Sequence, residues 1–444
     1  MEGVDLKSNQ NGYKDFELMD SFRIVIYSTL GIIIFFIPLN INGYVNTILY
    51  HLYLFIQENY IDLMKIYIVI MIIIGSILPI LKHKEKDYDT ISNIIKCVKP
   101  ISILFIFIIL SKKEYRLYSE DSLLFMQAFI LKSVILFSIS SIFMPLITDY
   151  GLLEIVESYF HKYTKKSLKI SGKCILNIMV YLFVDVFSGM FMTNVLYKKG
   201  KLRQNEACIM VSCFSFMSIM NCFYIADELN LKSKVFTILI TIFLGILINY
   251  LVCRMWPLKD KKKSYIQKSS YKESNFKKDK FKNAIRQYLV NKENKKLIYR
   301  MIENFKESFN IIMTILPNLV IIIFVGEFLI NNTGLVNAIS QIIYPFIEAL
   351  NLPETSQISE FICVGLFNGS RCIEFINNDI ENISILIVFI IYIVQTISIT
   401  TNVLYIDSTD IPLKKRELII IGLEKVLITL IIISVVYYLL ISYL

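Results

Sequence analysis

The chain has 444 residues, 55% of them hydrophobic, including 31 Phe and 27 Tyr. The apolar residues come in long blocks and exceed what a soluble domain of this length needs to bury, which excludes an ordinary soluble protein. Most of the formal net charge of +9 lies in the Lys-rich segment 259–300, between two apolar blocks. Such a segment is typical of a cytoplasmic loop. We therefore expect a protein embedded in a lipid bilayer, with no nucleic acid partner.

The apolar segments predict the helices of an all-α, polytopic integral membrane protein. Singly or with their flanks, several are long enough to cross roughly 30 Å of hydrocarbon. Residues 44–60 are rich in Tyr and predict an interfacial amphipathic helix, and 151–166 predict another because their apolar residues share one helical face. The apolar segments are 22–41, 63–81, 97–111, 122–147, 174–197, 206–226, 235–256, 309–330, 358–367, 383–406 and 418–443.

The residues that usually carry soluble-enzyme chemistry form no recognisable motif. The eight cysteines include no CxxC pair and nearly all fall in apolar segments, so they indicate small buried side chains and not disulfides or a metal site. The three histidines are scattered, and phosphate-binding loops and nucleophile elbows are absent from the sequence. We expect no enzyme activity, no catalytic residue, no metal and no resident cofactor.

An internal repeat is the most informative pattern. Three sequence landmarks recur in the same order about 180 residues apart, which predicts a duplicated unit. The matching pairs are 148–152 with 332–335, 184–189 with 364–369, and 218–225 with 398–406.

The second landmark contains a Phe-Ser-Gly or Phe-Asn-Gly step inside an apolar segment. Such a step is expected to break the helix, because glycine permits positive φ and the side-chain oxygen can bond freed backbone groups. Backbone broken at membrane depth must be buried in protein or line a watered cavity, and transporters use paired breaks to hold the solute. We predict two re-entrant hairpins, 170–197 and 356–378, with tips at Asp185–Gly189 and Phe367–Ser370. Each is followed by an interrupted transmembrane helix.

Polar residues at these breaks are the candidates for solute binding. Asp185 is an acid at membrane depth, which costs roughly 2.5–3.5 kcal/mol, so we expect it to bind an ion or the solute or to cap the hairpin tip. Asn221 and Asn402 recur in the same context, which favours a binding role over interhelical hydrogen bonding. Glu327 is expected at an interface or in a helix contact. The candidate binding residues are Asp185, Ser188, Gly189, Ser218, Asn221, Asn368, Gly369, Ser370, Gln395, Ser398 and Asn402.

Four stretches carry a family resemblance: FFIPLNING (35–43), PLITDYGLLE (145–154), MTNVLYKKGKLRQNEACIMVSCFSFMSI (192–219) and IYPFIEALNLPET (343–355). They resemble the membrane proteins that carry nucleoside-recognition, or Gate, domains. The layout is most similar to the YjiH-like group and more distantly to concentrative nucleoside transporters. The resemblance implies a bacterial inner-membrane location and a core of two gate repeats. It also implies that residues 198–206 form the cytoplasmic start of a helix.

These patterns divide the chain into N-terminal membrane helices with an interfacial segment (1–121), a first gate repeat (122–257), a basic cytoplasmic loop (258–305) and a second gate repeat with a C-terminal helix (306–444). We predict a secondary transporter for a small polar, nucleoside-like solute. Na⁺ or H⁺ is the candidate coupling ion, and a homo-oligomer is the candidate assembly. The alternative is a non-transporting Gate-domain scaffold or regulator, like relatives tied to spore maturation.

Overall fold

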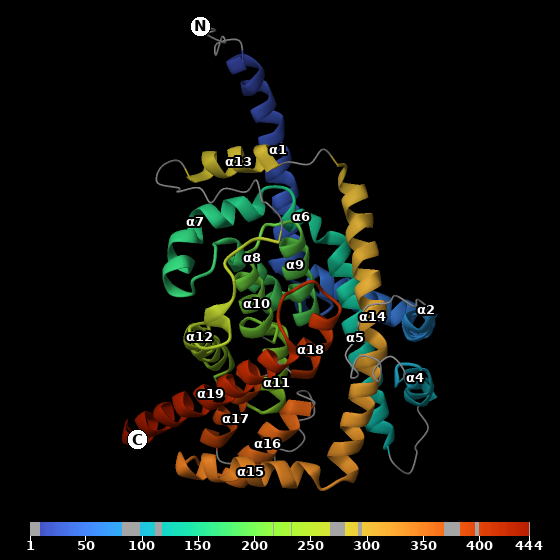
Figure 1. Ribbon diagram of the computed structural model, residues 1–444, viewed down its shortest axis with the longest axis vertical. Helices are drawn as coiled ribbons and strands as arrows, with labels where there is room; N and C mark the ends of the chain where they lie inside the picture. The colour runs from blue at the N-terminus through green and yellow to red at the C-terminus, as the bar shows by residue number, and fades with distance from the viewer. Residues whose placement is uncertain are drawn as a thin grey trace.

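Helices make up 81% of the computed structural model, with almost no sheet, which confirms the predicted all-α class (Figure 1). The structure describes the following residues: 9–81, 98–111, 118–215, 217–231, 233–266, 280–291, 295–367, 382–395 and 399–443.

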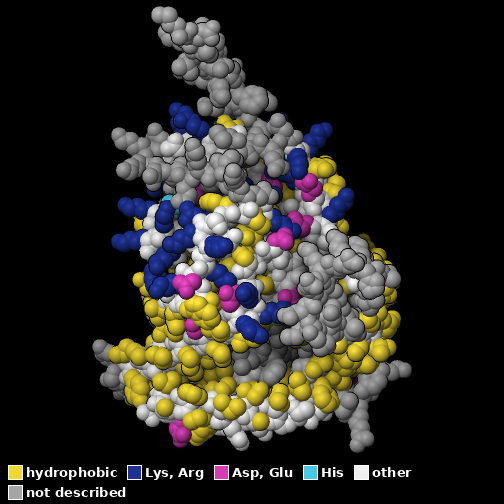
Figure 2. Space-filling view, viewed as in Figure 1, with side chains coloured by type: hydrophobic (Ala, Val, Ile, Leu, Met, Phe, Trp, Pro, Cys, Tyr) yellow, Lys and Arg dark blue, Asp and Glu magenta, His cyan; other side chains and the backbone are white. Residues whose placement is uncertain are grey.

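Five helices in this described part are long and apolar enough to span a membrane. Their outer faces are apolar, as at Phe243, which is 67% exposed, and Leu427, which is 51% exposed. Apolar side chains cover the lower half of the molecule, whereas Lys and Arg gather toward the upper end (Figure 2). An exposed apolar band of this kind is stable against lipid and not against water. The chain is therefore a multi-pass membrane protein. The candidate spans are Ile48–Pro79, Glu120–Phe143, Lys234–Val252, Leu297–Asn332 and Lys415–Leu439.

The N-terminal part corrects one prediction. Residues 44–47, predicted as the start of an interfacial helix, instead form a strand that pairs antiparallel with Pro38–Ile41. The reason is local, because Asn42 and Gly43 both have positive φ, as a two-residue hairpin turn requires. The helix that follows is kinked at Tyr60. The elements are α1 (Asn9–Phe36), β1 (Pro38–Ile41), β2 (Tyr44–Thr47), α2 (Ile48–Leu81) and α4 (Ile101–Ser111).

The middle of the chain folds as a long helix followed by seven shorter ones. The long helix α5 packs against both α2 and α9. The elements are α5 (Glu120–Phe143), α6 (Pro145–Thr148), α7 (Leu152–Ser167), α8 (Lys173–Phe183), α9 (Val186–Lys198), α10 (Gln204–Cys213), α11 (Ile219–Glu228) and α12 (Lys234–Val252).

The C-terminal part begins inside the predicted basic loop. Helix α13 lies within 258–305 and packs against α7, and the proposed boundary at residue 305 falls inside α14. The elements are η1 (Leu258–Asp260), α13 (Lys280–Asn291), α14 (Leu297–Asn332), α15 (Leu335–Ala349), α16 (Thr355–Phe367), α17 (Asn382–Gln395), α18 (Ile399–Asp407) and α19 (Lys415–Tyr443).

The order of elements recurs along the chain. The helices α7, α8, α11 and α12 begin about 180 residues before α15, α16, α18 and α19, respectively. In Figure 1 the amphipathic helix α7 lies toward the upper end of the molecule and its counterpart α15 lies at the lower end. The long helices α5 and α14 run side by side between the two ends. The two sets of helices therefore approach the centre from opposite ends.

Candidate functional site

Helices α8 and α9 form an antiparallel hairpin. The Asn177 side chain donates to Thr193 Oγ1 at 2.6 Å, and the Tyr181 hydroxyl lies 3.3 Å from the same oxygen. A Cβ on Gly189 would lie 2.5 Å from ring carbons of Tyr181, closer than van der Waals contact allows. Gly189 therefore lets the two legs of the hairpin pack closely.

The hairpin turns at Val184 and Asp185, and this corrects the predicted tip. Asp185 is the N-cap of α9, and its carboxylate accepts hydrogen bonds from the backbone N–H of Phe187 at 3.2 Å and of Ser188 at 3.0 Å. Ser188 and Gly189, predicted in the turn, lie in the first turns of α9 with helical backbone. The carboxylate satisfies the freed N–H groups, so the turn needs no glycine. Ser188 Oγ instead pairs with Ser140 Oγ at 2.6 Å.

The first predicted interruption is present after α10, which ends at Cys213 before α11 begins at Ile219. The N-cap of α11 is Ser218, whose side chain makes no capping hydrogen bond. Lys425 of α19, only 2% exposed, donates from Nζ to the Cys213 carbonyl at 3.3 Å. The interruption is thus contacted by a basic residue from a spanning helix.

A second basic residue lies at the other side of this interruption. Lys132, in the middle of α5, donates to Asn221 Oδ1 at 2.9 Å and lies 5.2 Å from the ring centre of Tyr50. Its charge also interacts with Asp185 at the hairpin turn. Sequence reasoning missed Lys132, although a lysine inside the apolar run FILKSVILF was a visible signal.

Helix α18 contacts the first interruption, and residues 396–398, which precede α18, lie outside what the structure describes. Helix α17 ends at Gln395 and α18 begins at Ile399. Asn402 of α18 donates from Nδ2 to Ser215 Oγ at 3.3 Å, and both residues are buried. The Oδ1 atom of Asn402 is buried with no hydrogen-bond partner in the described part of the chain. The predicted residues Asn368, Gly369, Ser370 and Ser398, and the side chain of Gln395, lie outside what the structure describes.

Polar contacts continue from this centre toward the upper end. The Tyr405 hydroxyl is buried near Tyr181 and Glu307, with no hydrogen-bond partner among the described residues. Glu307 of α14 accepts from Asn194 Nδ2 at 3.4 Å and from Lys198 Nζ at 3.0 Å. The hairpin of the first repeat is therefore connected to the long helix that precedes the second.

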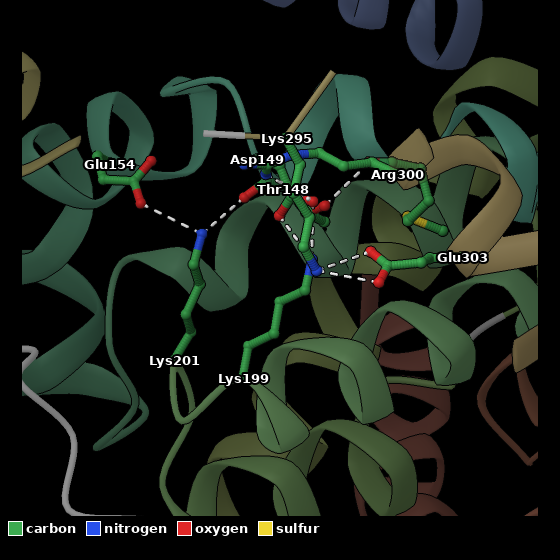
Figure 3. A network of polar contacts seen from close by, with 9 residues as sticks. Thr148, Asp149, Glu154, Lys199, Lys201, Lys295, Arg300 and Glu303 are labelled. Carbon is green, nitrogen blue, oxygen red and sulfur yellow. Dashed lines mark hydrogen bonds and ion pairs between the residues drawn. The ribbon is translucent and has the colours of Figure 1, made fainter. Parts of the chain in front are cut away.

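An ionic network lies above this connection. Figure 3 shows Lys199 and Arg300 reaching Asp149, at 2.7 Å and 3.2 Å, and Lys201 reaching the Thr148 carbonyl and Glu154. Burial alone would raise the pKa of Asp149, but the charges of Lys199, Lys201 and Arg300 and a hydrogen bond from Lys199 lower it to about 2. The carboxylate is therefore ionised at neutral pH.

The same end holds the start of α10. Glu206 accepts from the backbone N–H of Arg203 at 3.0 Å and of Ser171 at 2.8 Å, while Lys173 lies 3.6 Å from Glu157. The stretches around 148–151 and 198–206, distant in sequence, therefore belong to one buried network. This network fixes the ends of the hairpin legs.

A small cavity lies beside the hairpin turn, between α5, α9 and α14. Phe137, Phe187, Ile312 and Ile315 line it, and Ser133 is the polar residue on its wall. This lining fits an apolar group. The polar centre at Ser215 and Asn402 is a separate place in the fold.

Glu327 is completely buried in α14 and accepts from Asn331 Nδ2 at 3.0 Å. Among the described residues, no group of three or more His, Cys, Asp or Glu side chains is placed to hold a metal ion. No family model matches the chain, and neither a curated protein nor a solved structure does.

Proposed function

We propose that this protein is a secondary transporter for a small polar solute, bound where the two interrupted helices meet. The observation that carries the proposal is the contact between Asn402 and Ser215, one from each repeat. Asn402 is 1% exposed and its Oδ1 atom has no partner among the described residues. A buried unpaired acceptor costs about 1–3 kcal/mol, which a bound solute would offset.

The shape of the first hairpin supports a transport role. Its legs have 11 and 13 residues, whereas a spanning helix needs roughly 20. Legs of this length support our proposal that the hairpin enters and leaves the membrane on one side, as a re-entrant element does. Helices that approach a common centre from opposite ends and break there are a recurring design of transporters.

The proposal includes a family and a location. The chain is a Gate-domain protein of the bacterial inner membrane, similar in layout to the YjiH-like group. Support comes from the ionic network, because two of the resembling stretches, 145–154 and 192–219, meet there through Asp149 and Lys199. The upper end, with the basic helix α13, faces the cytoplasm because loops rich in Lys and Arg remain inside.

We assign the coupling of solute transport to an ion to Asp185 and Lys132. The Lys132 ammonium already supplies a positive charge near the carboxylate, so a bound Na⁺ would be repelled. A proton that moves on and off this pair is the better candidate. The solute site and the coupling site are joined by Asn221, which accepts from Lys132.

Uptake into proteoliposomes tests the transport proposal. The purified chain is supplied with a panel of radiolabelled nucleosides, nucleotides and small organic acids, with and without a pH gradient. We expect gradient-driven uptake that falls at least tenfold in Asn402→Ala and Asp185→Asn. Ser76→Ala is the matched control, because Ser76 is also buried in a span but bonds Ser102 and Lys99 away from the centre. Uptake of no panel member, or equal uptake by all variants, contradicts the proposal and favours a scaffold.

A further inference from the structure

Lys425 is a buried lysine that forms no ion pair with a carboxylate among the described residues. It lies in the spanning helix α19, is 2% exposed, and donates to the Cys213 carbonyl at 3.3 Å. An ammonium carries three N–H donors, so this bond satisfies one of them. In the described part of the chain, no carboxylate forms an ion pair with Lys425. The neighbouring groups are the thiols of Cys213 and Cys253, which lie 3.9 Å apart.

Lys425 contacts the C-terminal end of α10, where the interruption before α11 begins. Cys213 is the last residue of α10, and α11 starts after Ser218, which makes no side-chain cap. The Ser218 side chain thus leaves the first N–H groups of α11 uncapped, and the positive end of the helix dipole lies at the interruption. Asn402 contacts Ser215 in the same interruption. The Lys425 ammonium contacts the α10 end of the interruption, the Asn402 amide contacts Ser215 within it, and α11 begins at its other end.

The charges near the interruption do not balance. At its α11 side, the charge of Lys132 is opposed by that of Asp185. At its α10 side, Glu424 precedes Lys425 in the chain but forms no ion pair with it and has an Oε2 atom without a partner among the described residues. Lys425 thus lies in an apolar span without a direct ion pair to a described carboxylate, and a lysine at such a position is costly unless it has a function.

A purely structural role would be to cap the C-terminal end of α10. A lysine at a helix C-terminus contributes about 0.3–1 kcal/mol when exposed. Burial of the whole side chain in a span costs more than this gain, since insertion scales assign roughly 2.5–3.5 kcal/mol to a charge at that depth. Capping alone therefore does not explain Lys425.

We propose that the solute is an anion, and that Lys425 binds its carboxylate or phosphate group at the interruption between α10 and α11. This inference rests on the transport function proposed above, whose site it shares. The anion completes the bonding of the ammonium and of the first turn of α11. A neutral analogue leaves both unsatisfied and binds weakly.

Matched pairs of anion and neutral analogue test this assignment. The full-length protein is purified in detergent, and its thermal unfolding is measured with lactate against lactamide and with uridine monophosphate against uridine. These pairs separate a carboxylate from a phosphate ligand. Lys425→Met removes the charge and Lys425→Arg keeps it. Lys99→Met is the control, because Lys99 is also buried and donates to a backbone carbonyl, that of Thr314.

We expect one anion to raise the melting temperature and its neutral analogue to leave it unchanged. Lys425→Met should weaken the apparent affinity for that anion about tenfold or more, whereas Lys425→Arg and Lys99→Met should retain it. Equal binding of the neutral analogue, undiminished binding by Lys425→Met, or binding of neither anion overturns the inference.

The same samples in proteoliposomes separate the two proposals. Anion binding without flux refutes transport and leaves the anion site in place. Flux of a neutral solute that Lys425→Met does not change refutes the proposal that the solute is an anion. The transport proposal then still stands.

Discussion

Lys132 on α5 donates to the side-chain oxygen of Asn221 on α11 at 2.9 Å, and its charge interacts with Asp185 at the hairpin turn. One side chain thus connects a spanning helix, an interrupted helix and the end of a hairpin. The arrangement places a charged hydrogen bond between two helices within electrostatic reach of the carboxylate at the hairpin turn. The predictions below test this contact and those around it.

Lys132 and Asp185 should contribute to stability in a way that is not additive. In Lys132→Met the Asn221 oxygen loses its charged donor and Asp185 loses a nearby positive charge, and we expect a loss of about 1.5–3 kcal/mol in unfolding free energy. The double variant with Asp185→Asn should lose at least about 1 kcal/mol less than the two single losses combined. Thermal and denaturant unfolding in detergent measure all four proteins. Strictly additive losses mean that the two residues act independently.

Gly189 should be intolerant of a side chain. Its Cβ would lie 2.5 Å from the Tyr181 ring, so Gly189→Ala must push the two legs of the hairpin apart, at a cost of about 1–3 kcal/mol. A Cβ on Gly326, which is also helical, would meet no atom within 4 Å, so Gly326→Ala should leave stability unchanged or raise it by up to about 1 kcal/mol. Melting temperatures of the two variants compare them directly. Equal effects show that the hairpin legs are not in close contact.

Asp149 should make stability depend on pH in the acid range. Its pKa is lowered from 3.8 to about 2 in the folded protein, so the ionised form stabilises the fold at every pH above about 4. That contribution, about 2 kcal/mol, is lost as the pH falls from about 4 to 2. Unfolding measured from about pH 7 down to about pH 2 should show the loss in the wild type. Asp149→Asn should be less stable at pH 7, with the difference narrowing on acidification. A difference that stays constant with pH shows that the carboxylate is not coupled to the lysines.

Lys198 should affect flux more than stability. It bridges Glu307 at 3.0 Å and Asp410 at 3.3 Å, and is 41% exposed, so the pairs contribute less than about 1 kcal/mol. The contacts nevertheless join the end of the first hairpin to the second repeat, and a transporter must open such a connection in each cycle. We expect Lys198→Glu to change the uptake rate several-fold, and the exchange Lys198→Glu with Glu307→Lys to restore it. Unchanged uptake in Lys198→Glu would show that these ion pairs play no part in transport.

Structural elements that depend on neighbouring residues in the sequence could be predicted from it. Apolar length predicts the spans. The position of Asp185 also has a local basis, since an acid before an apolar helix is an N-cap signal. The interruption between Cys213 and Ile219 was likewise expected from its polar residues. The turn at Asn42 and Gly43 was missed, although an Asn-Gly pair is a strong hairpin signal.

The contacts that build the candidate site could not be predicted in this way. Lys132 and Asn221 are 89 residues apart, Asn402 and Ser215 are 187, and Lys425 and Cys213 are 212. Local sequence propensity does not predict contacts between residues so far apart in the chain, because these contacts depend on how helices from both repeats pack. Gly189 illustrates the same limit. Its sequence context indicates a helix break, whereas its role is set by Tyr181 on the opposite leg.

If the protein is a secondary transporter, the place where α18 contacts the first interruption should open to each side of the membrane in turn. A single cysteine at Ser218, 5% exposed, in a variant whose eight native cysteines are replaced, tests this without knowledge of the solute. Membrane-impermeant maleimide is applied to right-side-out and to inside-out vesicles. Labelling of Ser218→Cys is expected from both sides. Labelling from one side only, or from neither, contradicts the transport proposal.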